Sequence, residues 1–217
     1  MEFRTTMRVL GPLFALVLAS IGVPARCCPS ALMLAPTTDV IPVGHLSMEY
    51  QGDSTTPVSS DTAKQFINTE IGWARNFEAG VDLDVSDDAH GRAILNGKYR
   101  FDLAPKLSAA VGAQSIDSRF KSIPYVTSGL ETSIARVTLG ALHYEGDTSW
   151  FVGLDRAFNH KLTLMADYVS GDAFYASAGL SYSFTPQFGL VAGAEFPNMD
   201  GGDTVYSVHF VMCGNAW

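Results

Sequence analysis

The sequence predicts an all-β protein, a single antiparallel β-barrel of about twelve strands that spans a membrane after an N-terminal signal peptide. Three observations support this fold class. A short apolar run follows two arginines at the N-terminus. No later run of about 18 apolar residues follows, so no transmembrane helix is available. From Val43 onward, short segments alternate apolar and polar residues and are separated by turn residues at regular spacing.

Residues 1–25 are expected to form a signal peptide that is removed from the mature chain. Arg4 and Arg8 precede the apolar stretch VLGPLFALVLASIGV, and the VPA that follows places small residues where a signal peptidase cleaves, after Ala25. A retained membrane anchor is the alternative. It is disfavoured because the run is short and contains Gly11 and Pro12.

Residues 26–42 are expected to form an extended periplasmic leader. Acylation of Cys27 or Cys28 is an alternative, but Arg26 stands where a lipoprotein cleavage motif usually has a small residue. The third cysteine, Cys213, lies at the far end of the chain, so no disulfide framework can be assigned. Whether the leader from Cys27 to Pro42 plugs the barrel stays open.

The barrel is expected over residues 43–213, followed by a C-terminal tail at 214–217. Its strands are predicted at 43–51, 66–75, 78–86, 91–101, 107–116, 122–130, 135–144, 149–157, 161–170, 175–185, 188–196 and 203–212. Pro124 lies inside the segment 122–130 and reduces it to a strand end or a bulge.

Two faces are distinguishable along these strands. One face is apolar, with aromatic residues such as Trp73, Tyr99 and Trp150 toward the strand ends, as interfacial girdles require. The other face is polar and rich in Gly, Ser and Ala, which suits the inside of a closed barrel. A soluble β-sandwich would also alternate and remains an alternative, but its solvated face would be richer in Lys and Glu.

The connections alternate between longer polar loops and tight turns, with both termini on the tight-turn side. This layout is typical of outer-membrane barrels. The chain, and above all NHKLTLMADYVSGDAFYASAGLSYSFTPQFGLVAGAEFPN, resembles bacterial outer-membrane β-barrel proteins of the small porin-like kind. The resemblance implies an outer-membrane location, with membrane lipid and the outer-membrane assembly machinery as partners. That machinery reads a terminal aromatic residue; here Trp217 is terminal, but CGNA interrupts the alternation after Met212.

Charged residues on the polar face are the candidate functional residues, expected to line the lumen. They are Glu49, Glu70, Asp82, Asp84, Lys98, Arg100, Arg136, Asp155, Asp167 and Glu195. The acids Glu78, Asp82 and Asp84 are expected to face Lys98 and Arg100 across neighbouring strands. Such a ladder of opposite charges has two possible roles. It either pairs the charged groups of the barrel interior with one another, as a structural feature, or sets the ion preference of a pore. Because inward acids outnumber inward bases, a conducting pore should prefer cations.

His45 and His209, on the first and last strands, are expected to point inward near the periplasmic end and are weak candidates for a metal site, since no third ligand is at hand. No cofactor is expected. The chain has 14 Lys+Arg against 22 Asp+Glu and no basic run, so nucleic acid is not expected as a partner.

The leading functional hypothesis is a channel for passive diffusion of small hydrophilic solutes or ions. A non-conducting structural or adhesive barrel, plugged by its own charged residues, is the alternative. A barrel enzyme is disfavoured, because no serine is clearly level with a histidine and a carboxylate.

Overall fold

The computed structural model describes residues 31–56, 64–86, 91–116 and 122–217. The predicted signal peptide, Cys27 and Cys28 therefore lie outside the described residues. Among the residues that are described, no helix is long and apolar enough to cross a membrane.

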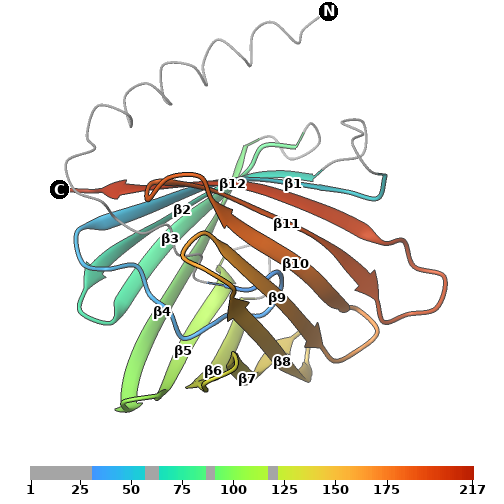
Figure 1. Ribbon diagram of the computed structural model, residues 1–217. Helices are drawn as coiled ribbons and strands as arrows, with labels where there is room; N and C mark the ends of the chain where they lie inside the picture. The colour runs from blue at the N-terminus through green and yellow to red at the C-terminus, as the bar shows by residue number, and fades with distance from the viewer. Residues whose placement is uncertain (1–30, 57–63, 87–90, 117–121) are drawn as a thin grey trace, which may run out of the picture.

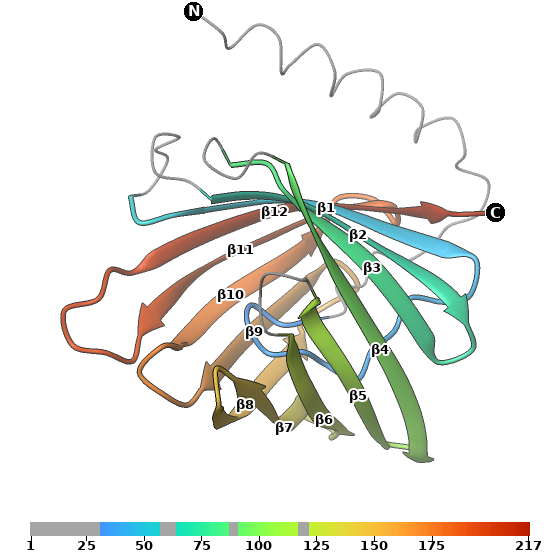
Figure 2. The same cartoon turned by 180° about the vertical axis from the view of Figure 1, so that it is seen from behind.

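The described chain forms one closed antiparallel barrel of twelve strands (Figures 1 and 2). The strands are β1 (His45–Ser54), β2 (Lys64–Ala74), β3 (Phe77–Asp84), β4 (Arg92–Ala104), β5 (Leu107–Ile116), β6 (Ile123–Glu131), β7 (Arg136–Tyr144), β8 (Asp147–Ala157), β9 (Leu162–Val169), β10 (Tyr175–Ser183), β11 (Phe188–Pro197) and β12 (Val205–Asn215). Each strand pairs with its neighbours in sequence, and β1 pairs with β12 to close the barrel. The predicted fold class and strand count are confirmed.

Local sequence explains where the strands turn. Tyr144 pairs with Asp147 across a two-residue hairpin whose central residues, Glu145 and Gly146, both have positive φ. This geometry matches the right-handed twist of paired strands, and glycine adopts it without strain. Pro124 is the second residue of β6, so it lies at a strand end, as predicted.

The outer surface of the barrel is apolar and the lumen side is polar or small. On β7, Leu139 is 52% exposed, whereas its neighbour Thr138 is completely buried inside the barrel. Aromatic rings pair on the outer surface, with centroids 5.2 Å apart for Trp150 and Tyr168. Alternation of this kind allows one face of each strand to contact lipid while the other lines the lumen.

The last strand is longer than predicted. β12 continues to Asn215, where the sequence analysis placed the tail at 214–217. Val211, Met212 and Cys213 are all buried, so burial stops alternating at the end of this strand, as predicted, although strand pairing continues past Met212. Pairing of Asn215 with His45 lengthens the seam with β1, and the ring of Trp217 lies 5.7 Å from that of Trp73.

The predicted periplasmic leader also differs from the structure. Residues 31–42, which we call the lumen segment, lie inside the barrel instead of extending away from it (Figures 1 and 2, blue). Ala35 and Thr37 are completely buried there. Proline at positions 36 and 42 favours an extended chain, but burial of the intervening residues determines where that chain lies.

Replacing Leu139 by arginine tests whether the outer face contacts lipid. We expect Leu139→Arg to lower the free energy of unfolding by about 2–4 kcal/mol, the cost of a cation near the bilayer midplane. The measurement is a denaturant titration of the barrel in phospholipid vesicles. Asp203→Arg in the exposed loop after β11 is the control. Equal stability of the two variants would contradict a lipid-facing surface.

Candidate functional site

The lumen segment joins the barrel wall at the turn end of β2. The Gly44 N–H donates to the Gly72 carbonyl at 2.9 Å, and Val43 and Gly72 form an isolated parallel bridge. A Cβ atom at Gly72 would lie 2.2 Å from the carbonyl oxygen of Pro42. Only glycine at position 72 allows the backbone of the segment to approach this closely.

A buried ion pair holds the next residue of the segment. The Ile41 N–H donates to Glu78 Oε2 at 2.7 Å, and Glu78 Oε1 lies 3.0 Å from Lys98 Nζ. Glu78 and Lys98 are directly opposite on β3 and β4, and both side chains are buried. Because a buried charge is costly unless it is paired and hydrogen-bonded, both contacts stabilise this carboxylate while the segment is in place.

Asp39 is the acidic residue of the lumen segment, and two arginines bind it. It forms ion pairs with Arg136 and, at 3.6 Å, with Arg100. Arg136 also donates to Asp155 Oδ1 at 2.8 Å. Next to Asp39, Thr38 shares a 2.6 Å hydrogen bond with Ser108. The segment is therefore fixed to β4, β5 and β7 by polar contacts.

A third carboxylate holds the far part of the segment. Asp167 Oδ2 accepts from the N–H groups of Leu34 and Ala35 at 3.0 and 3.3 Å, and Asp167 Oδ1 accepts from Ser177 Oγ at 2.6 Å. Main-chain donors buried away from water require such partners. Asp167 supplies them where the segment has no sheet neighbour of its own.

Apolar contacts also hold the lumen segment against the barrel wall. Leu32, Met33 and Ala35 pack with inward-facing side chains of the wall, namely Tyr125, Leu142, Phe151, Met165, Val169, Val191, Val211 and Cys213. Glycines leave the space for them. A Cβ atom at Gly153 would lie 2.2 Å from Leu32 Cδ1, and one at Gly179 would lie 2.7 Å from Met33 Sδ. The small residues predicted for a narrow lumen thus also accommodate the segment.

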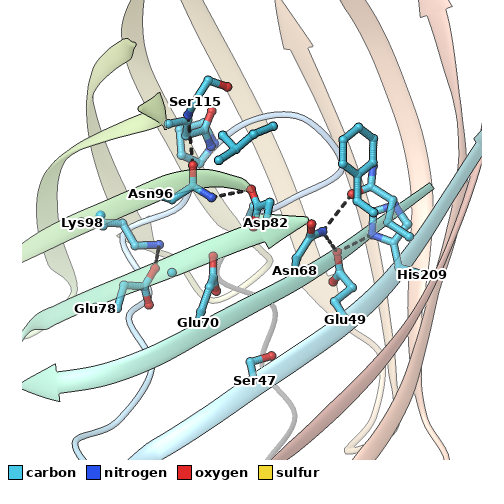
Figure 3. A pocket seen from close by; sticks show the side chains of 18 of the residues that line it. Ser47, Glu49, Asn68, Glu70, Glu78, Asp82, Asn96, Lys98, Ser115 and His209 are labelled. Carbon is cyan, nitrogen blue, oxygen red and sulfur yellow. Dashed lines mark hydrogen bonds and ion pairs between the residues drawn. The ribbon is translucent and has the colours of Figure 1, made fainter. Parts of the chain in front are cut away.

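Two cavities remain beside the lumen segment, and residues of the segment line both. The first, of about 440 Å³, is bounded mainly by β1–β5 and β12 (Figure 3), and we call it the acidic cavity. Its charged lining residues are Glu49, Glu70, Glu78, Asp82, Lys98 and His209. The second, of about 710 Å³, lies at the turn end of β7–β10, and we call it the turn-side cavity. Its charged or titratable lining residues are Asp39, Arg136, Asp155, His160 and Lys161.

Side-chain amides bind two of the carboxylates of the acidic cavity (Figure 3). Asn68 donates to Glu49 at 3.1 Å, and His209 Nδ1 lies 3.1 Å from the same carboxylate. Asn96 donates to Asp82 and accepts from the Ser115 N–H at 3.0 Å. These contacts fix the directions of two carboxylates that line the same cavity.

The structure places eight of the ten predicted lumen residues in three environments. Glu49, Glu70, Asp82 and Lys98 line the acidic cavity. Arg136 and Asp155 line the turn-side cavity. Arg100 and Asp167 contact the lumen segment. Asp84 accepts from the Ser86 N–H and Glu195 from Ser207, and neither lines a cavity.

The predicted charge ladder is correct for one pair only. Glu78 does face Lys98, but the β3–β4 register places Asp82 opposite Ile94 and Asp84 opposite Arg92. Asp82 binds the amide of Asn96 instead of a base. Arg100 turns to Asp39 and, at 2.7 Å, to Asp102. The acidic partner of Arg100, which was predicted on β3, is therefore supplied by the lumen segment.

His45 and His209 do not form a pair. The β1–β12 register places His45 opposite Asn215 and His209 opposite Gln51. Six residues along a strand separate these levels by about 20 Å. Within the described ranges, no group of three or more His, Cys, Asp or Glu residues could hold a metal ion.

The residues that sequence reasoning missed are those of the lumen segment, notably Leu32, Met33, Thr38 and Asp39. One signal was present. The apolar run ALMLA lies between Pro29 and Pro36, a few residues after the expected cleavage site. An apolar run that is too short for a strand of the barrel, in a chain with a lumen lined by glycine, indicates a segment that packs inside.

Comparison with known proteins supports the fold. No family model and no curated protein sequence matches the chain. Among solved structures, it is similar to the KdgM porin in complex with disordered oligogalacturonate, with a TM-score of 0.59 and 13% identity over 76% of this chain and 98% of that chain. It is also similar to the NanC porin, with a TM-score of 0.54 and 13% identity over 78% of this chain and 98% of that chain. The chain thus has the fold of an outer-membrane porin-like β-barrel.

A disulfide between the lumen segment and the wall tests this arrangement. Because the hydroxyl oxygens of Thr38 and Ser108 lie 2.6 Å apart, cysteines at the two positions are within reach of an S–S bond of about 2.05 Å. In a background without native cysteines, we expect Thr38→Cys with Ser108→Cys to crosslink under mild oxidation. Mass spectrometry of tryptic peptides detects the link. Thr38→Cys with Asp203→Cys should not crosslink, and equal yields would contradict a segment seated in the lumen.

Proposed function

We propose that this protein is an outer-membrane channel for passive diffusion of small hydrophilic solutes, in which the lumen segment acts as a removable constriction. The observation that carries the proposal is the pair of cavities beside the lumen segment, both lined by charged and polar side chains within one closed barrel. A barrel built only as a scaffold has no need of polar, water-filled space on its inside.

Cation preference is part of the proposal. Four carboxylates and one lysine line the acidic cavity and give it a formal charge of −3 with His209 neutral. A ring of carboxylates in a low-dielectric lumen attracts cations and repels anions. The KdgM porin was solved with oligogalacturonate, a polyanion. For this chain the acidic lining favours a solute of opposite charge.

A non-conducting barrel is the second candidate. The observation that favours it is the number of polar contacts that hold the lumen segment. Three of its N–H groups bind Glu78 and Asp167, and its carboxylate binds Arg100 and Arg136. If these contacts never open, the barrel serves as a closed structural element of the outer membrane.

Conductance with the segment locked or absent separates these candidates. We expect the oxidised Thr38→Cys, Ser108→Cys barrel to conduct less in a planar bilayer than the same protein after reduction. Deletion of residues 31–40 should give larger steps still, because it removes the constriction. The single variant Thr38→Cys, which cannot crosslink, is the control for the reductant. Silence from every form, each shown to be folded by heat-modifiable gel migration, would favour the non-conducting barrel.

The acidic cavity should determine ion preference. Replacing Asp82 by Asn and Glu49 by Gln removes two of its four carboxylates and leaves a formal charge of −1. We expect the reversal potential of the conducting barrel in a salt gradient to shift toward zero. Asp84→Asn is the matched control, since Asp84 is on the same strand as Asp82 but lines neither cavity. A shift as large for Asp84→Asn would remove the acidic cavity from the mechanism.

A further inference from the structure

We propose that the acidic cavity is a binding site for a small hydroxylated organic cation, such as an amino sugar. The inference rests on the proposed function, because it names the class of solute that the channel would hold. It rests on three features of the cavity. One carboxylate has a neutral hydrogen-bond partner, one buried histidine nitrogen has no hydrogen-bond partner among the described residues, and amide side chains line the same wall.

The first feature is the charge of Asp82. The partner that the structure gives this carboxylate is the neutral amide of Asn96, whereas Glu78 in the same cavity is paired with Lys98. Glu49, which also lines the cavity, is bound by Asn68 and His209. An ammonium group of a solute would supply the opposite charge at Asp82, and a charge-assisted hydrogen bond of this kind is stronger than a neutral one.

The second feature is independent of the acidic residues. His209 lines the cavity and is only 7% exposed, and its Nε2 has no hydrogen-bond partner among the described residues. A buried polar atom without a partner is uncommon and calls for a ligand or water. Nδ1 lies 3.1 Å from Glu49, so Nε2 is the nitrogen left for a solute, as an acceptor in the neutral ring and as a donor in the protonated ring. A sugar hydroxyl both donates and accepts, so it can bind Nε2 in either form.

The third feature is the rest of the lining. Gln51, Asn68, Asn96 and Gln114 bring side-chain amides, which both donate and accept, to the cavity wall. Sugar hydroxyls also donate and accept, so amides match them. The volume of about 440 Å³ lies in the usual range for sites that bind small molecules.

Two other ligand classes fit less well. A bare metal ion needs several ligands converging on one point, and no such group of His, Cys, Asp or Glu occurs within the described ranges. An anionic sugar would place its carboxylate beside Glu49 and Asp82, at the cost of like-charge repulsion. A hydroxylated cation avoids both difficulties.

Titration of the folded barrel in detergent with three sugars of the same ring tests the inference. The probes are D-glucosamine, D-glucose and D-glucuronate, which carry positive, neutral and negative charge, and binding is followed by ligand-observed NMR. We expect glucosamine to bind at least tenfold more tightly than glucose, and glucuronate to bind most weakly. Asp82→Asn should weaken glucosamine binding about tenfold, which corresponds to about 1.4 kcal/mol. Glu49→Gln provides a second variant should the first not fold, and Asp203→Asn is the control.

The outcomes separate this inference from the proposed function. Equal affinity for glucosamine and glucose would overturn the inference, as would unchanged glucosamine binding in both folded variants. Displacement of glucosamine by an equal concentration of Mg²⁺ would overturn it too, because the cavity would then be a general counterion site. Binding is measured independently of conductance. A barrel that does not conduct in a bilayer yet binds glucosamine would therefore contradict the proposed channel function and support the proposed binding site.

Discussion

A sheet closed into twelve strands encloses more space than its own inward side chains fill, and the rest of this structure follows from that constraint. Closure gives every strand two neighbours, so no sheet edge is left exposed in the membrane. It also leaves a lumen that must be filled by water, by large side chains or by another part of the chain. Here the lumen segment fills the centre, and glycines such as Gly153 and Gly179 leave it room. The two cavities lie beside it.

The same constraint explains the distribution of charge. Charged groups inside the barrel are costly unless paired, and the lumen segment brings both N–H donors and one carboxylate to them. On the turn side, Asp39 and Asp155 face Arg136, so acid and base are close to balance. On the β1–β5 side, no base among the described residues is shown paired with Asp82. The polarity of the lumen is therefore uneven, and carboxylates outnumber bases in the lining of the acidic cavity.

The number of strands, and which side chains point into the lumen, were predictable from the sequence. Both follow from the alternation of apolar and polar residues, interrupted by Gly, Pro and Asn at turns, which is a local property of the sequence. The partners inside the barrel were not. The opposition of Asp82 and Ile94 depends on register, which a shift by one residue would change completely. The position of Asp39 between two arginines depends on a segment with no periodicity at all. For such a segment only the composition, an apolar run between prolines, gives any indication of burial.

Whether a plugged barrel can also be a channel depends on what the wall residues would lose if the segment left. Each charged residue that holds the segment has a second partner on the wall itself. Glu78 remains beside Lys98, Arg136 beside Asp155, Arg100 beside Asp102, and Asp167 beside Ser177. Departure of the segment would therefore leave none of these four charges without a partner on the wall, and water would hydrate the groups that it uncovers. A segment meant to stay permanently has no need of such duplicate contacts, which favours a removable constriction over a fixed plug.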